Sequence, residues 1–400
     1  MIRLFVGLTL LLLLVGCEEE LTVPGRCPEL CPGGQPTVFD TIIPAIDAGD
    51  SSFFGYSGHG ALTALLVSDG LEAGEARAWT KFPERPDSIT VVGTRYAYTV
   101  DSVVFTFFLL ARDTLVDDLK LFLHRAPRTI DSLATFEDIS AALVPETLID
   151  SIMVPDSVRS GTIQVKISDS TTLANLIPAD DTGRLALAVR MNAEESTGIR
   201  LSAMGGSGGG GRFITYARID VADTSLQRQT LALNSEDNGF ALADQDEPID
   251  PDLLYVGRVP SSRSLLRFQV PEFFNDSAVR LVRATLQLTP AEPILGLRGD
   301  PGVVDVRGTS VDIGAKSTPF FQVNGSKALP ASSSDVFEIE ILDVVQFWRL
   351  GEAGLAPTLV LALAPDGGSF HRPVFFSTRQ ALDGPRLRIT YLRPSAVEQP

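Results

Sequence analysis

The chain contains few of the residues that usually carry metal and redox chemistry. Three cysteines, three histidines and two tryptophans occur among 400 residues. The histidines, His59, His124 and His371, stand far apart, so no pair has the i, i+4 spacing of a His-Glu-x-x-His zinc site. Isolated histidines of this kind are more typical of ordinary surface or strand positions than of a metal centre or catalytic triad.

Basic residues are also scarce relative to acidic ones. The chain has 33 Lys and Arg against 50 Asp and Glu, which gives a formal net charge of −17. A field of this sign repels nucleic acid and anionic lipid headgroups. It is compatible with neutral glycans, cationic partners or calcium, so we expect no nucleic-acid partner.

The N-terminal apolar run is too short to cross a membrane. It extends from Leu4 to Val15, whereas the hydrocarbon core of a bilayer requires ~20 apolar residues. Because the run follows the single positive charge of Arg3, it is typical of the hydrophobic region of a secretory signal peptide.

The end of this run is Leu14-Val15-Gly16-Cys17, followed by three glutamates. It resembles a bacterial lipobox, which implies a lipoprotein signal peptide at residues 1–16 and a diacylglycerol on the thiol of Cys17. Acyl chains contribute ~0.8 kcal/mol per buried methylene group, so two or three of them anchor a protein stably. The alternative is a plain signal peptide with a fortuitous cysteine.

Residues 17–36 are expected to form the lipidated cysteine and a spacer rich in proline and glycine. This segment holds the other two cysteines, Cys27 and Cys31. A compartment beyond the inner membrane is oxidising, so a local disulfide is the expected state of this pair. Zinc needs more ligands than the segment offers, and the Cys-x-x-Cys-His motif of haem attachment is absent.

The rest of the chain contains an internal repeat. The segment "ALLVSDGLEAGEARAWTKFPE" (64–84) aligns with "LLYVGRVPSSRSLLRFQVPE" (253–272), and "RFITYAR" (212–218) recurs in "RLRITYLR" (386–393). The partners are separated by similar distances in sequence, which favours a duplicated domain. We therefore expect one domain at residues 37–219 and a second at residues 220–395.

Both halves consist mainly of short β-branched or alternating runs, which predict strands. Examples are "DSVVFTFFLLA" (101–111), "GTIQVKI" (161–167) and "PTLVLALAP" (357–365), while "DVVQFWRLGEAG" (343–354) is the clearest helix. Many short strands with long returns predict an all-β fold of two tandem antiparallel β-sandwich domains, jelly-roll-like in topology.

The second half resembles the DNRLRE-type jelly-roll domain, a family of secreted proteins related to carbohydrate-binding modules. The resemblance rests on "SLLRFQVPEFF", "VRLVRATLQL", "VFEIEILDVVQFWRLGEAG" and the closing "VFFSTRQALDGPRLRITY", in the order of the family. It implies glycan attachment or scaffolding outside the cell and implies no catalysis. Residues 293–332 are longer than this region usually is in the family, and the first half matches less well.

Motifs of catalysis are weak in this sequence. Gly205 to Gly209 satisfies G-x-S-x-G, but the segment "RFITYARID" that follows predicts a strand, whereas a nucleophile elbow requires a helix there. Adjacent carboxylates such as Asp180-Asp181 would point to opposite faces of a strand. We therefore expect a protein that is not an enzyme.

An acidic segment suggests a calcium site. "NSEDNGFALADQDEPIDPD" (234–252) contains Asp244, Asp246, Asp250 and Asp252. Calcium binds six to eight oxygens from carboxylates and carbonyls on flexible loops. The EF-hand spacing is absent, so a solvated acidic loop without metal is the alternative to a structural calcium ion.

Exposed aromatic rings beside polar groups are expected at a sugar-binding site. The candidates are Phe53, Phe54 and Tyr56 in "SSFFGYSGHG", and Phe320 and Phe321 in "TPFFQV". The alternative is that these rings close one end of a sandwich. Trp79 and Trp348 lie in repeat-matching segments and are expected in the core.

These observations predict a lipoprotein of the bacterial outer membrane, periplasmic or exposed on the cell surface. We expect a non-catalytic binding module attached to the membrane through its lipid, with a polysaccharide as the first ligand to test. The alternative is a structural scaffold or adhesion subunit that contacts another envelope protein.

Overall fold

A computed structural model describes residues 37–55, 62–177, 183–243, 249–257, 261–349 and 356–393. Strands β1 to β24 dominate these residues, and every named strand pairing is antiparallel. The predicted all-β fold with antiparallel sheets is therefore confirmed. No helix in these residue ranges is long and apolar enough to cross a membrane.

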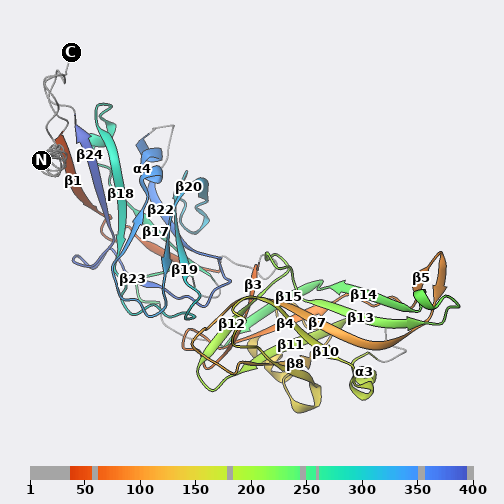
Figure 1. Cartoon of the computed structure of the whole chain (residues 1–400). Helices are drawn as coiled ribbons and strands as arrows, with labels where there is room; N and C mark the ends of the chain where they lie inside the picture. The colour runs from red at the N-terminus through yellow and green to blue at the C-terminus, as the bar shows by residue number, and fades with distance from the viewer. Residues whose placement is uncertain are drawn as a thin grey trace, which may run out of the picture.

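The strands form two lobes that meet at one end of each (Figure 1). The first lobe comprises the described residues of 62–243. Its larger sheet contains β3 (Ala64–Asp69), β7 (Tyr98–Arg112), β10 (Gly161–Ile167), β12 (Thr197–Ser202), β13 (Arg212–Ile219) and β14 (Arg228–Asn234). Its second sheet contains β4 (Ala76–Phe82), β8 (Lys120–Arg125), β9 (Leu148–Met153), β11 (Leu185–Asn192) and β15 (Asp237–Leu242).

Short elements complete the first lobe. They are the ribbon of β5 (Ile89–Val91) and β6 (Thr94–Tyr96), helices α2 (Phe136–Ala141) and α3 (Ser170–Leu176), and the 3₁₀ turns η2 (Pro145–Thr147) and η3 (Thr224–Leu226). Helix α2 begins at a capping box, because Thr135 and Asp138 each bind the other's backbone N–H.

The second lobe comprises the described residues of 37–55 and 249–393. One sheet contains β1 (Thr37–Pro44), β18 (Arg280–Leu288), β21 (Phe337–Glu340) and β24 (Arg386–Arg393). The other contains β2 (Ser51–Phe54), β17 (Ser262–Arg267), β19 (Gly302–Thr309), β20 (Pro319–Leu329) and β22 (Ala356–Ala364). The lobe also holds the pair β16 (Leu253–Tyr255) and β23 (Val374–Phe376), helix α4 (Leu342–Arg349), and turns η4 (Glu272–Asn275) and η5 (Gly314–Lys316).

Each lobe has its own hydrophobic core between its sheets. Phe82, Phe105 and Phe213 are fully buried in the first lobe, with ring centroids 5.1 to 6.1 Å apart. In the second lobe Phe268 and Phe375 are buried among aliphatic residues of both sheets. Alternation sets these faces: in β10 the buried residues are Ile163, Val165 and Ile167, with exposed residues between them.

The two lobes share one strand order. The sheet β15-β4-β11-β8-β9 of the first lobe corresponds to β2-β17-β22-β19-β20 of the second, strand for strand. The run β14-β13-β7-β10 likewise corresponds to β1-β24-β18-β21, and the pair β3-β12 to β16-β23. The repeated segments of the sequence, β4 with β17 and β13 with β24, occupy equivalent positions, as a duplication predicts.

The strand pairing does not divide the chain at residues 219 and 220, where the repeat suggested a boundary. Strands β14 and β15 follow that point but pair with β13 and β4 of the first lobe. Strands β1 and β2 precede the first lobe but pair with β24 and β17 of the second. The first lobe is thus inserted between β2 and β16. A repeat in a sequence shows which segments are equivalent. It does not show whether a given strand pairs with strands of the first lobe or of the second.

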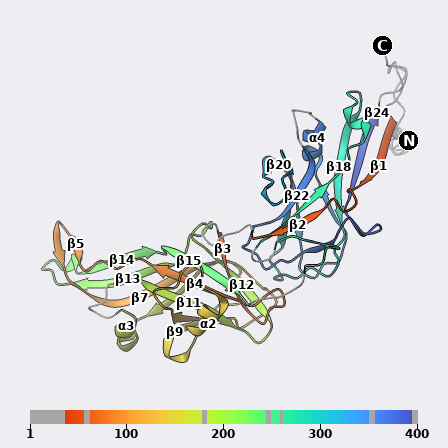
Figure 2. The same ribbon diagram turned by 180° about the vertical axis from the view of Figure 1, so that it is seen from behind.

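The two lobes meet near β3 and β12 of the first lobe (Figures 1 and 2). Phe370 of the second lobe is 2% exposed and belongs to the first lobe's core cluster. Arg298 Nε of the second lobe donates to the buried carboxylate of Asp113 at 2.9 Å. The lobes are therefore joined by apolar packing and ion pairs as well as by the chain.

Candidate functional site

The sheet β2-β17-β22-β19-β20 carries both of the aromatic pairs that the sequence singled out. Phe53 and Phe54 lie on β2 at one edge, and Phe320 and Phe321 lie on β20 at the opposite edge. Four strand spacings of ~4.8 Å separate the two edges, or roughly 19 Å. The structure places the pairs on one sheet but does not join them in one cluster.

Phe53 and Phe54 pack against their own lobe. Both are half-buried, and the ring of Phe54 lies 5.8 Å from that of Tyr255. Phe53 faces Gly314, in the loop between β19 and β20. Tyr56, the third candidate in this segment, lies outside the described residues. The described part of the aromatic segment therefore contributes to packing at one edge of the sheet.

The two phenylalanines of β20 have different environments. Phe320 is half-buried, with its ring 5.5 Å from the ring of Phe347 on α4. Phe321 is 76% exposed, and the guanidinium carbon of Arg307 lies 5.0 Å from its ring centroid. A cation over the face of a ring is attracted by the ring quadrupole, which fixes the relative orientation of the two groups.

Hydrogen bonds hold Arg307 in this position. Its Nε donates to the carboxylate of Asp305 at 2.5 Å, and Asn324 Nδ2 donates to the other carboxylate oxygen at 2.6 Å. Asp305 and Arg307 are on β19, and Asn324 is the register partner of Arg307 on β20. We call Phe321, Arg307, Asp305 and Asn324 the Phe321 patch.

Sequence reasoning found only Phe321 of this patch. A signal for two more residues was present, because "VVDVR" (303–307) alternates aliphatic and charged residues in the way that is typical of a strand. Val304 and Val306 are fully buried, which turns Asp305 and Arg307 to the opposite face of the sheet.

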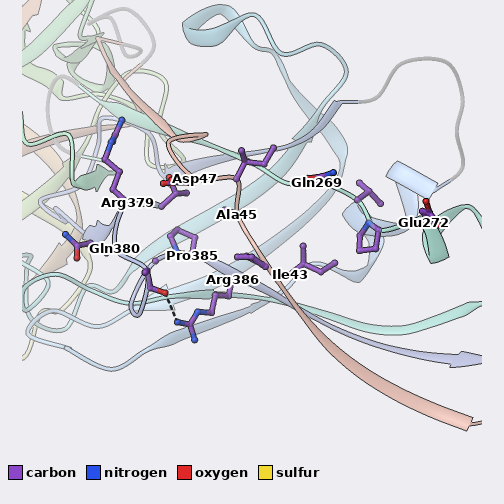
Figure 3. A pocket seen from close by; sticks show the side chains of 16 residues that line it. Ile43, Ala45, Asp47, Gln269, Glu272, Arg379, Gln380, Pro385 and Arg386 are labelled. Carbon is purple, nitrogen blue, oxygen red and sulfur yellow. Dashed lines mark hydrogen bonds between the residues drawn. The ribbon is translucent and has the colours of Figure 1, made fainter.

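A concave surface lies at the end of β1. This groove, of about 800 Å³, lies between residues 43–47, residues 269–272, residues 378–381 and residues 384–386. Figure 3 shows Pro385 and Arg386 close to Ile43 and Ala45, and Arg386 Nη2 donates to the carbonyl of Ala381 at 3.2 Å. Aliphatic and proline residues line it together with charged and amide groups. None of these lining residues is aromatic, so they offer no ring on which a sugar could stack.

The acidic segment is described in part. Asp244 and Asp246 lie outside the described residues. The backbone N–H of Asp252 donates to Asp250 Oδ1 at 2.8 Å, and the N–H of Asp250 donates to the Tyr255 hydroxyl at 3.0 Å. Within the described ranges no group of three His, Cys, Asp or Glu side chains could hold a metal ion. Calcium binding therefore stays a prediction.

The three cysteines, Cys17, Cys27 and Cys31, also lie outside the described residues. The lipid on the first and the disulfide between the other two stay predictions.

Two histidines are described, one in each lobe, and both are buried. His124 Nδ1 lies 3.1 Å from Thr147 Oγ1, and burial together with nearby Arg190 holds the pKa of His124 below its usual value. His371 Nδ1 lies 3.1 Å from Ser369 Oγ. The glycines from Gly205 to Gly209 form a turn between strands β12 and β13, as their context predicted, and not the strand-to-helix elbow of a hydrolase.

Comparisons with known proteins add little. No protein-family model matches the chain, and no curated protein matches it. The structure of infectious bursal disease virus, Gx strain, aligns over 94% of this chain and 81% of that chain, with 9% identity and a TM-score of 0.13. The VP2 subviral particle of infectious bursal disease virus aligns over 92% and 79%, with 11% identity and a TM-score of 0.13. Scores this low support no inference about fold or function.

Proposed function

We propose that the protein is a non-catalytic binding module of the bacterial envelope, attached to the outer membrane by a lipid on Cys17, with a glycan as its ligand. The observation that carries this proposal is the Phe321 patch. It combines an exposed aromatic ring with a guanidinium, a carboxylate and an amide on two paired strands. Hydrogen bonds link the three polar groups, and the guanidinium lies over the ring.

The chemistry of the patch suits a neutral sugar. An aromatic ring offers an apolar face to the C–H groups of a pyranose, and the neighbouring polar groups can accept and donate hydrogen bonds to its hydroxyls. Because Arg307 and Asp305 are paired with each other, their charges largely cancel locally. The surface therefore favours an uncharged polysaccharide over a strongly charged ligand.

A scaffold or adhesion subunit that contacts another envelope protein is the second candidate. The half-burial of Phe53 and Phe54 favours it, because those rings are used for packing within the lobe and are not presented together as a platform. In this alternative the exposed ring of Phe321 would anchor a protein partner, since exposed aromatics are also common at the centres of interfaces.

The test is a glycan-array assay on the soluble chain from residue 18 onward, with and without calcium. We expect saturable binding that weakens about tenfold in Phe321→Ala, as the loss of one aromatic contact predicts. Leu382→Ala is the matched control, because Leu382 is 83% exposed in the same lobe but outside the patch. Both variants should have the same melting temperature as the parent chain.

A blank array across neutral and acidic polysaccharides would contradict the glycan proposal and direct the search to protein partners. If Phe321→Ala leaves glycan binding unaffected, the glycan site lies outside the patch. The groove near Arg386 is then the next surface in which to make substitutions.

A further inference from the structure

The second lobe receives two of its strands from the opposite end of the chain. In the first lobe, the edge positions beside β13 and β4 are filled by β14 and β15, which follow β13 directly in sequence. In the second lobe, the equivalent positions beside β24 and β17 are filled by β1 and β2, at residues 37–54. We call residues 37–55 the donor segment.

The donor segment occupies only sheet edges. Strand β1 is terminal in β1-β24-β18-β21, and β2 is terminal in β2-β17-β22-β19-β20. Edge strands can leave without breaking any pairing among the strands that remain, and the exposed edge that results is a template for another strand. An identical segment from a second copy would fit the same edges.

Specific side-chain contacts hold the donor segment. Arg388 on β24 donates from Nε and Nη2 to the same carboxylate oxygen of Asp40 on β1, at 2.9 and 2.6 Å. The ring of Phe39 stacks on Tyr391 with centroids 5.2 Å apart, and the Ser52 hydroxyl lies 2.8 Å from that of Ser264. All these partners belong to the second lobe, so the contacts are independent of which copy supplies the donor.

The connection between β2 of the donor segment and β3 is nine residues long in the sequence. Residues 55–63 lie between β2 and β3, and nine extended residues span up to ~30 Å. Exchange of an identical element between two copies is a low-cost route to a closed, twofold dimer.

We propose that the donor segment of one copy completes the second lobe of another, giving a reciprocally exchanged dimer of this chain. The single-copy structure and the dimer contain the same strand pairings and side-chain contacts. Protein concentration therefore determines which of them predominates.

Charge reversal at Asp40 and Arg388 tests the proposal. In Asp40→Arg the new arginine of the donor segment faces Arg388 of its own chain. In Arg388→Asp the new aspartate of β24 faces Asp40 of its own chain. A reciprocal dimer of the two variants contains one native Asp40–Arg388 pair and one reversed pair. We expect the two variants, refolded together from denaturant, to form at least tenfold more dimer by light scattering than either variant refolded alone.

The double variant Asp40→Arg/Arg388→Asp is the control, because it restores an opposite-charge pair within one chain and should behave as the parent does. If the mixed variants remain monomeric after refolding together at high concentration, the proposal is wrong. If a single variant precipitates, the experiment uses the parent chain instead, with tagged and untagged copies refolded together. Capture of the untagged chain supports exchange, and its absence overturns the proposal.

Discussion

Arg200 of β12 and Asp300 of the second lobe form an ion pair across the junction between the lobes. The Nη1 atom of Arg200 lies 2.7 Å from each oxygen of the Asp300 carboxylate. The two side chains are only 13% and 12% exposed, so water screens them weakly. The pair therefore links the stability of one lobe to the position of the other.

Removal of one partner should destabilise the protein because it leaves the other charge nearly buried and unpaired. We expect Arg200→Met or Asp300→Asn to lower the free energy of unfolding by roughly 2 kcal/mol. The double variant should lose less than the sum of the two single changes. Urea unfolding of the four proteins measures this coupling, and strictly additive losses would show that the pair contributes nothing to stability.

Phe370 should be the most important apolar contact of the junction. Its side chain is 2% exposed and packs beside Gly198, where an added Cβ would lie 3.0 Å from the ring. We expect Phe370→Ala to lower the free energy of unfolding by ~3 kcal/mol. Phe321→Ala makes the same substitution at an exposed ring and should change the free energy of unfolding by less than ~0.5 kcal/mol. Equal losses in the two variants would contradict the assigned packing.

Stability should fall between about pH 6.5 and pH 4 because of His371. Burial, opposed by Asp300 and reinforced by Arg200, lowers the pKa of this imidazole from 6.5 to about 4. As pH falls through this window, the unfolded chain takes up a proton that the folded protein does not bind. The free energy of unfolding should therefore decrease by up to ~3 kcal/mol.

The comparison that isolates this effect is with His371→Gln, which cannot titrate, because carboxylates also protonate in part of this range. The parent should lose more stability than the variant between pH 6.5 and pH 4. Parallel pH profiles of the two proteins would show that His371 is protonated equally in the folded and unfolded states.

Calcium should raise the melting temperature if the acidic segment binds it. An ion held by Asp244, Asp246, Asp250 and Asp252 would stabilise the folded chain by mass action, and chelation should then lower the melting temperature by roughly 5 °C. Asp250→Asn/Asp252→Asn should abolish the response. An unchanged melting temperature of the parent on chelation would dispose of the calcium site.

Local patterns in the sequence predicted the elements well. The alternation in "GTIQVKI" gives β10 at the predicted residues, and the helical spacing from residue 343 gives α4 from Leu342 to Arg349. Trp79 is fully buried as expected, and Trp348 packs partly buried against the second core. These features depend on neighbours within a few residues, which a sequence displays directly.

Long-range pairing could not be predicted in the same way. Asp40 and Arg388 are 348 residues apart, and no local pattern shows that β1 completes the second lobe. The Phe321 patch depends on the register of β19 and β20, which shifts between Arg307 and Thr309. Such a shift changes which side chains share a face, so the neighbours of Phe321 could not be predicted from spacing alone.

The register of β1 and β24 pairs Thr37 with Arg393, so the chain enters and leaves the described structure at adjacent points on the second lobe. The first lobe extends away from this point, beyond the junction (Figures 1 and 2). A tether attached before Thr37, such as the lipidated spacer that we propose, would therefore join the molecule at the end of the second lobe that lies away from the junction. In the anchored protein that we propose, the inserted lobe is then the part of the molecule farthest from the point of attachment.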